Sequence, residues 1–368
     1  MKENERITNA FVSFIYGDIL AVNERNKSLK EKIKVGSKQY SYASELFLIL
    51  SKSLVDNKKL YEVIVDNNRL CAELDLWKYY ITEKASNISN RINIGVNYYN
   101  NQEYWDCKIG SGFSSVILFA LANKNYSVAQ RAAYGQILIF NRHPQVVIAG
   151  LLLVRTTHLL LENSEITQLE LSERLKDFLI HLQLSDLENE FLSELPNSYR
   201  VSFEREKISF ILEIGSIHHN NLTEKKIMTG KNKFLEAIYF YWELVENGEI
   251  HVDYVDSEAS LEISAIAHTL YALNNKLTFE EAHENINWKF VKEMSAYINK
   301  LRHFHVGKKR YIPCKQNIDL FSLQVGDRVK HRLLNLCKIV EKRVVKHEGE
   351  TETLITVECK SGMYELKQ

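Results

Sequence analysis

Proline and glycine are scarce in this sequence. Its 368 residues include only 3 Pro and 14 Gly. Glycine and proline favour turns and interrupt helices. A chain with few of them is therefore expected to be mainly helical. The length is sufficient for one large hydrophobic core with a small additional domain.

Cysteines and long apolar runs are also few. The five cysteines show no CxxC spacing, which predicts reduced thiols rather than disulfides or a thiolate zinc site. They are Cys71, Cys107, Cys314, Cys337 and Cys359. The first residues, MKENERITNAF, lack a signal-peptide pattern, and no apolar run reaches the roughly 20 residues of a membrane span. We therefore expect a cytoplasmic protein without a membrane segment.

Net charge is absent, because 47 basic residues balance 47 acidic ones. No global electrostatic field then selects nucleic acid or an anionic membrane, and any such preference must be local. A local excess of basic residues does occur near the carboxyl end. Its members are Lys308, Lys309, Arg310, Arg328, Lys330, Arg332, Lys338, Lys342 and Arg343. They predict contact with nucleic acid or a partner protein, or simply a solvated sheet face on which lysines protect edge strands.

The carboxyl-terminal fifty residues change from helical periodicity to alternation. Short alternating segments (VGDRVKH, CKIVEKRVVKH, TETLITVECK and MYELK) are separated by turn residues at 326–327, 348–350 and 361–362. We predict an all-α domain over residues 1–307, a basic linker over 308–317, and a small SH3-like β-barrel over 318–368. Within the first domain, helices are expected at 9–22, 40–50, 56–72, 73–84, 130–140, 144–161, 166–197 (two), 233–247, 259–274, 278–287 and 288–304.

The segment Tyr40–Leu50, YSYASELFLIL, is expected to begin a central helix. Ser41 and Ser44 can accept hydrogen bonds from the free N–H groups of a helix start, and Glu45 suits the first turn. The apolar run that follows leaves no polar face, so the helix should be buried. A helix start that points into a cleft can also hold a ligand through backbone N–H groups; the alternative is an ordinary buried helix with a serine cap.

A second candidate site is the glycine–serine loop, which we define as residues 110–115, GSGFSS, ahead of the apolar run VILFALANK. Glycines let a backbone approach a phosphate, and serine hydroxyls and a helix start add donors. The candidate ligand-binding residues here are Gly110, Ser111, Gly112, Ser114 and Ser115. His143, directly before Pro144, is either a cleft residue or a helix cap.

The order of these segments resembles that of the ADP-ribosylglycohydrolase family, whose members have an orthogonal all-α fold and a binuclear magnesium cleft. Gly17-Asp18 matches the Gly-Asp of the family's opening helix, and residues 40–46 are similar to its Tyr-Thr-Asp-Asp-Thr-Glu-Leu motif. Residues 110–115 resemble the loop that holds the ADP-ribose diphosphate. His143-Pro144 matches part of its Thr-His-Pro, and residues 278–287 resemble the lead into the last metal motif. The resemblance implies an ADP-ribose or nucleotide ligand near Ser41, Tyr42, Ser44 and the glycine–serine loop.

The sequence departs from the family at the metal ligands. Tyr42 and Ala43 stand where the family has adjacent aspartates, and Val291 and Glu293 align with the aspartates of the last motif. Magnesium requires oxygen ligands, so this replacement predicts that no metal cofactor is held. Without the metal, the means of activating a water at the glycosidic carbon is lost.

Three functions follow as hypotheses. The first is a catalytically inactive recognition or adaptor module that binds an ADP-ribose-type ligand or nucleotide, with the C-terminal domain contacting nucleic acid or a partner. The second is a hydrolase with altered, metal-independent chemistry that uses Asp18, Glu45 or Glu293 as acid and base. The third is a helical scaffold whose cleft is closed by the ring of Tyr42.

Overall fold

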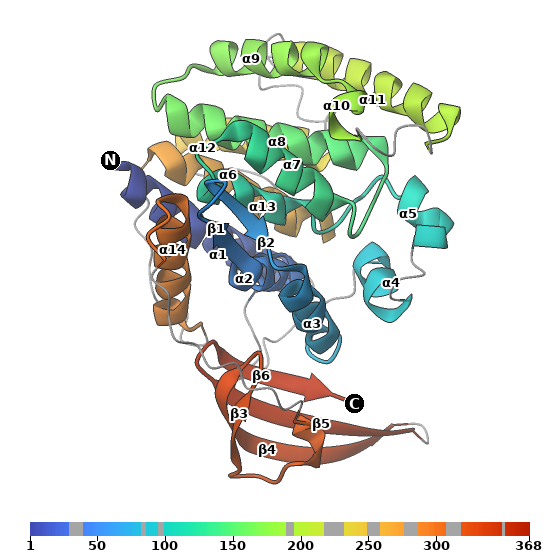
Figure 1. Ribbon diagram of the computed structural model, residues 1–368, viewed down its shortest axis with the longest axis vertical. Helices are drawn as coiled ribbons and strands as arrows, with labels where there is room; N and C mark the ends of the chain where they lie inside the picture. The colour runs from blue at the N-terminus through green and yellow to red at the C-terminus, as the bar shows by residue number, and fades with distance from the viewer. Residues whose placement is uncertain are drawn as a thin grey trace.

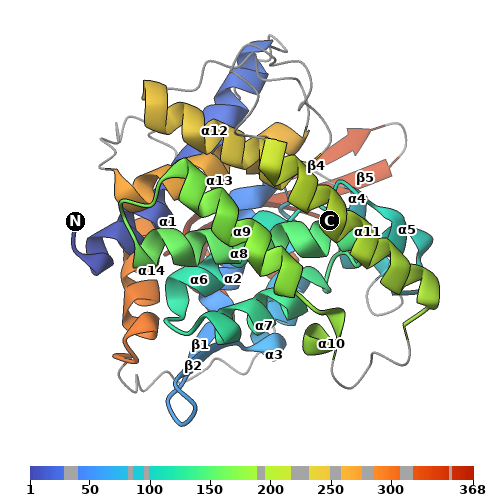
Figure 2. The same ribbon diagram turned by 90° about the horizontal axis from the view of Figure 1, so that it is seen from above.

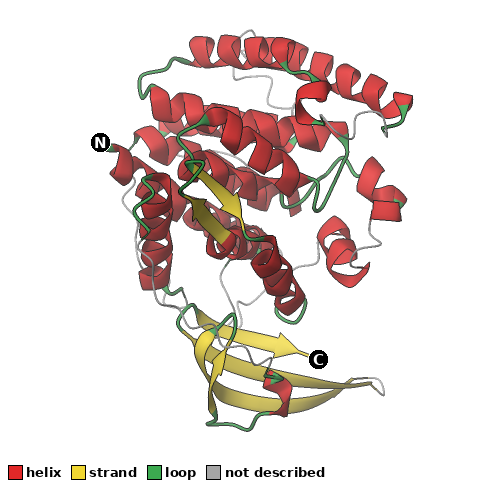
Figure 3. Ribbon diagram, viewed as in Figure 1, coloured by secondary structure: helices red, strands yellow, loops and turns green. Residues whose placement is uncertain are grey.

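The protein is a helical body with a small carboxyl-terminal antiparallel sheet at one end (Figures 1 and 3). The structure is a computed structural model. It describes residues 1–28, 40–81, 86–94, 99–188, 195–216, 232–248, 258–275, 286–306, 318–347 and 350–368. The expected linker over 308–317, with Lys308, Lys309 and Arg310, lies outside the described residues. So does most of the helix expected at 278–287; its last two residues, 286 and 287, are described and precede α14.

The longer helices are α1 (Glu3–Ser28), α2 (Tyr42–Ser53), α3 (Asn67–Trp77), α4 (Ser86–Ile94), α7 (Tyr126–Ile137), α8 (Pro144–Glu162), α9 (Gln168–His181), α11 (Asn197–Ser216), α12 (Lys233–Asn247), α13 (Glu258–Asn274) and α14 (Trp288–Arg302). Short helices are α5 (Gln102–Asp106), η2 (Phe113–Val116), α6 (Ile117–Ala122), α10 (Leu184–Leu187) and η4 (Leu320–Ser322). The strands are β1 (Leu54–Asn57), β2 (Glu62–Val65), β3 (Arg328–His331), β4 (Asn335–His347), β5 (Glu350–Cys359) and β6 (Gly362–Lys367).

The helices form layers that are seen edge-on in Figure 1 and from above in Figure 2. α9 and α11 form the layer farthest from the sheet domain, and α7 and α8 lie beneath them. α1, α2, α3 and α14 lie on the side of the body that faces the sheet. α8 is 19 residues long and apolar enough to cross a membrane, but 89% of its most apolar window is buried inside the body. It is a core helix of this fold, and Pro144 occupies its first turn as expected.

α1 and α13 pack along most of their length, and Gly17 is the point of close approach. A Cβ at Gly17 would lie 2.6 Å from the backbone oxygen of Ser264 and 3.0 Å from the Cβ of His268. The Ser264 hydroxyl donates to the Gly17 carbonyl at 2.7 Å. Gly17 therefore lacks a side chain because α13 packs directly against it. This close contact places the neighbouring residue, Asp18, in the centre of the body.

The helix predicted over residues 56–72 is wrong for residues 56–66 and confirmed for residues 67–72. Leu54–Asn57 and Glu62–Val65 form an antiparallel hairpin, and α3 begins only at Asn67. The hairpin has a run of β-branched residues, which favour strands, and the side chain of Asn123 receives the Val63 N–H at 2.8 Å. The predicted helix over 73–84 is likewise displaced, because α3 ends at Trp77.

The predicted carboxyl-terminal strands are confirmed, and they form an antiparallel meander in the order β3-β4-β5-β6. Among the described residues β3 and β6 are not paired, so the structure has a sheet without the closure of a barrel. The sheet packs on the helical body. The rings of Tyr80 and Tyr364 lie 4.8 Å apart, and the Lys367 N–H donates to the Tyr79 carbonyl at 2.8 Å.

Candidate functional site

The start of α2 is occupied by the carboxylate of Asp18. One Asp18 oxygen accepts from the N–H groups of Ser41 at 2.9 Å and Ser44 at 3.2 Å, and the other accepts from the Ser41 hydroxyl at 2.6 Å. Ser41 is the N-cap of α2, as predicted, and its hydroxyl oxygen accepts from the Ala43 N–H. The donors that could have held a ligand anion at this helix start are therefore bonded to an internal acid.

Asp18 is fully buried, and burial raises its pKa to about 6, while the hydrogen bonds from Ser41 and Ser44 act in the opposite direction. A carboxyl with this pKa is mostly ionised at neutral pH. Its negative charge at the amino end of α2 suits the helix dipole. The observed role of Asp18 is to cap α2 and to join it to α1.

The glycine–serine loop also holds an internal acid, Glu262 of α13. One Glu262 oxygen accepts from the Gly112 N–H at 2.8 Å, from the Ser114 hydroxyl at 2.7 Å and from the Ser114 N–H at 3.4 Å. Gly112 has φ +96°, a conformation that favours glycine, and this orients its N–H toward the carboxylate. The anion cradle predicted from the sequence thus exists, and its anion is part of the chain.

The second oxygen of Glu262 faces a cation. Lys233 Nζ lies 2.6 Å from it and also donates to the Ser111 hydroxyl at 3.3 Å. The hydroxyl of Tyr42 donates to the same Glu262 oxygen at 3.3 Å. Glu262 and Tyr42 are fully buried and Lys233 is 9% exposed. We call this group, Tyr42, Ser111, Gly112, Ser114, Lys233 and Glu262, the Glu262 network.

The other predicted acids have partners of their own. Glu45 is buried and accepts from the indole N–H of Trp77 at 2.7 Å. Glu293 is exposed on α14 and forms an ion pair of 2.6 Å with Lys360 of the sheet domain. Glu293 therefore lies in surroundings different from those of the other two acids. Burial raises the pKa of Tyr40, and the charges of Glu45 and Asp18 add to this, so both acids lie near Tyr40. Each of the three acids is nevertheless hydrogen-bonded or paired with a different partner.

The remaining predicted ligand residues have structural roles. His143 is the N-cap of α8, where its Nδ1 accepts from the Gln145 N–H at 3.2 Å. Burial, with the nearby charge of Lys108, lowers the pKa of His143 to about 4, so the ring is neutral. Ser115 donates to the Gly112 carbonyl at 2.9 Å, and Gly110, at φ +54°, packs under the side chain of Val146.

Metal ligands are also missing from the parts of the chain that the structure describes. No group of three or more His, Cys, Asp or Glu side chains there has the arrangement to hold an ion. The positions of the expected aspartates, Tyr42 and Ala43, are both buried in the first turn of α2. The side chains present do not fit a binuclear magnesium centre.

The predicted basic surface is only partly available. Lys342 donates to the carbonyls of Phe321 and Leu323, at 2.7 and 3.0 Å, and Arg343 forms an ion pair of 2.8 Å with Glu365. The other described members are Arg328, Lys330 and Arg332, which are exposed, and Lys338, which is half-buried opposite Glu358. The sheet therefore presents mixed charge, and its basic residues are spread over β3 and β4.

Lys233 and Glu262 were not candidates from the sequence. Each has a weak local signal: a lysine immediately after the N-cap Asn232, and a lone acid in the apolar segment LEISAIA. Neither signal shows that the two side chains meet, because the contact depends on the packing of α12 against α13.

No protein-family model matches the chain, and no curated protein matches it either. The relationship to ADP-ribosylglycohydrolases accordingly remains a prediction from the motifs.

The raised pKa of Asp18 predicts a specific pH dependence of stability. Its folded pKa of about 6 lies above the usual 3.8, so its contribution is fully present below pH 3.8 and is lost as pH rises through about 6. Two pKa units correspond to roughly 3 kcal/mol of unfolding free energy.

Asp18→Asn keeps one acceptor for the Ser41 and Ser44 N–H groups. It should remove this decrease of the unfolding free energy with pH, as measured by urea unfolding between pH 4 and 7. Asp75→Asn, at an exposed position of α3, is the control; an unchanged slope in Asp18→Asn would contradict the prediction.

The ion pair within the Glu262 network predicts strong coupling between its members. Lys233→Met leaves a buried carboxylate without its cation and should lower the free energy of unfolding by about 3–5 kcal/mol. The double variant Lys233→Met/Glu262→Gln should lose less than the sum of the two single variants, with a coupling of about 1–3 kcal/mol.

Urea unfolding of the four proteins measures this coupling. The matched control is the exposed pair Arg174 and Glu170 of α9, 2.8 Å apart, for which the coupling should be about 0.3–0.5 kcal/mol. If the losses in free energy of unfolding of the two single variants add up to that of the double variant, Lys233 and Glu262 are not coupled, and the prediction is wrong.

Proposed function

We propose that this chain is a catalytically inactive, ADP-ribosylglycohydrolase-like protein whose helical body is a scaffold with a closed cleft. The observation that carries the proposal is the Glu262 carboxylate, which accepts from Gly112 and Ser114 in the loop that the resemblance assigns to a diphosphate. A ligand phosphate would have to displace this acid and leave its charge buried without partners, which is energetically costly.

Tyr42 supports the same proposal at the other side of the cleft. Its side chain is fully buried where the resemblance places a magnesium-binding aspartate, and its hydroxyl donates to Glu262. A nucleotide held by the glycine–serine loop remains the recognition alternative, with less support. The metal-independent hydrolase also has less support, because Asp18, Glu45 and Glu293 have separate partners.

We further infer that the carboxyl-terminal sheet is an SH3-like domain that contacts a partner protein in the cytoplasm. Its outward face has exposed apolar side chains, Leu336 (67%) and Met363 (52%), beside charges of both signs. In the strand register Lys338 lies opposite Glu358, and Glu358 lies opposite Met363, so these residues share a face. Mixed charge with apolar residues fits a protein partner better than a nucleic-acid backbone, which requires unpaired cations.

The closed cleft predicts that the full chain releases no ADP-ribose from an ADP-ribosylated protein, with or without magnesium. Calorimetric titration with ADP-ribose should show no dependence on magnesium and no effect of Ser114→Ala. Magnesium-dependent release would overturn the proposal. Binding that Ser114→Ala weakens would instead restore the glycine–serine loop as a nucleotide site.

The sheet proposal predicts weak binding to oligonucleotides. Fluorescence anisotropy of labelled single- and double-stranded oligonucleotides should give dissociation constants no tighter than about 10⁻⁶ M at physiological salt, the non-specific range. The double variant Arg328→Glu/Lys330→Glu tests the basic strand. Tight binding that falls steeply with salt and is lost in this variant would make nucleic acid the partner.

A further inference from the structure

Two free cysteines face each other in the carboxyl-terminal sheet. Cys337 on β4 is directly opposite Cys359 on β5 in the antiparallel register, so the two side chains lie on the same face of the sheet. Both are free thiols in the structure. Their separation in the sequence does not indicate a pair, because only the register of the two strands brings them together.

The cysteine pair occupies a non-hydrogen-bonded position between β4 and β5. Ile339, two positions later on β4, donates its N–H to the Asp327 carbonyl at 3.0 Å and accepts from the Gly326 N–H at 2.8 Å. Backbone groups alternate in direction along a strand, so Cys337 also directs its N–H and carbonyl toward β3 and away from β5. Opposite residues at such a position have Cα atoms about 4.5 Å apart, the closest approach in an antiparallel sheet.

This spacing permits a disulfide with little movement of the backbone. The Cα atoms of disulfide-bonded cysteines are usually about 4.4–6.8 Å apart, so the pair lies at the short end of the range. Burial raises the pKa of Cys337, and the charge of Cys359 adds to this, which is consistent with neighbouring sulfur atoms. A disulfide at the edge of the allowed geometry is more easily reduced, which is typical of reversible bonds.

The two thiols differ in access to solvent, and neither is held by a strong contact. Cys337 is 2% exposed, whereas Cys359 is half-buried. Cys359 Sγ lies 3.0 Å from the Ser361 hydroxyl, and Cys337 Sγ lies 3.5 Å from the Val329 carbonyl. Thiols form only weak hydrogen bonds, so little opposes a rotation of either side chain. Cys359 is therefore the thiol that an oxidant in solution meets first.

We propose that Cys337 and Cys359 form a reversible disulfide by exchange with a low-molecular-weight disulfide such as oxidised glutathione. The Cys359 thiolate attacks one sulfur of the small disulfide, whose S–S bond breaks and releases one small thiol. Cys337 then loses its proton and attacks the Cys359 sulfur of the mixed disulfide, which releases the second small thiol. In total, two protein thiols are oxidised and one small disulfide is reduced to two thiols. Disulfides in cytoplasmic proteins are usually transient and often redox-sensing.

The modification site lies beside the contact between the sheet and the helical body. Ser361, the neighbour of Cys359 Sγ, accepts from the Tyr364 hydroxyl at 2.9 Å. The ring of Tyr364 packs on Tyr80 of the body. A Cys359 sulfur bonded to Cys337 has no proton to donate to Ser361. Oxidation therefore changes a hydrogen bond at the turn that holds the sheet against the body.

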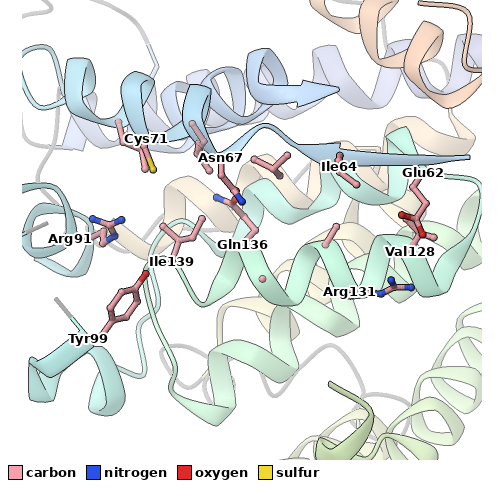
Figure 4. A pocket seen from close by; sticks show the side chains of 15 residues that line it. Glu62, Ile64, Asn67, Cys71, Arg91, Tyr99, Val128, Arg131, Gln136 and Ile139 are labelled. Atoms are coloured by element: carbon pink, nitrogen blue, oxygen red, sulfur yellow. The ribbon is translucent and has the colours of Figure 1, made fainter. Parts of the chain in front are cut away.

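The test is to equilibrate the folded full chain with reduced and oxidised glutathione at a series of ratios. The exchange is stopped with acid, the remaining thiols are blocked with N-ethylmaleimide, and the peptides are identified by mass spectrometry. At oxidising ratios the peptides of Cys337 and Cys359 should be linked, with the loss of two hydrogens, and reduced glutathione should restore both thiols. Cys71 is the control, an exposed thiol on α3 that lines a separate cavity (Figure 4). It has no residue paired with it across a strand ladder, so it should stop at the mixed disulfide.

Two single variants test the order of the steps. Cys337→Ser should leave Cys359 as a mixed disulfide with glutathione, because the second thiol is missing. Cys359→Ser should leave the buried Cys337 as a free thiol. The proposal is overturned if both cysteines of the unaltered chain stay free at the most oxidising ratio, if Cys359 is linked to another cysteine, or if the link forms only in urea. These outcomes are read from the unaltered chain, so the test stands even where a variant fails to fold.

Discussion

The buried charge of Glu262 is the constraint on which the centre of this fold depends. A carboxylate inside a protein is tolerated only when a cation and donors surround it. Here they come from three distant parts of the chain: the start of α2, the glycine–serine loop and the start of α12. These segments must therefore meet at α13 in one arrangement. Gly17 adds a second constraint. Its close contact with α13 fixes α1 so that the Asp18 carboxylate caps α2.

The same two acids occupy the hydrogen-bond donors of the region that resembles a ligand cleft. Backbone N–H groups at a helix start and in a glycine–serine loop are suited to an external phosphate. In this chain Asp18 is bonded to the first set and Glu262 to the second. Since both carboxylates belong to the core, opening the site would expose or strand a charge on which the packing of several helices depends. The hydrogen bonds that stabilise the core are thus the same ones that occupy these donors.

Features that depend on residues close together in the sequence were predicted, and features that depend on residues far apart in the sequence were not. The Ser41 cap, the helix at 233–247 and the alternation of the terminal strands are local features, and the structure confirms them. The hairpin at residues 54–65 was mistaken for a helix, because its pairing is reinforced by Asn123, some sixty positions away. The Glu262 network was missed for the same reason. A single sequence contains the residues of a long-range contact without showing that they meet.

Buried polar groups in this protein are of two kinds, and the difference between them is informative. Both oxygens of Asp18 and of Glu262 accept hydrogen bonds from the chain, so these acids hold helices together. Gln136 is equally buried but has no bonded partner in the described structure, and it sits beside a glycine that α7 does not need. A bonded polar group specifies the fold, whereas an unbonded one weakens it.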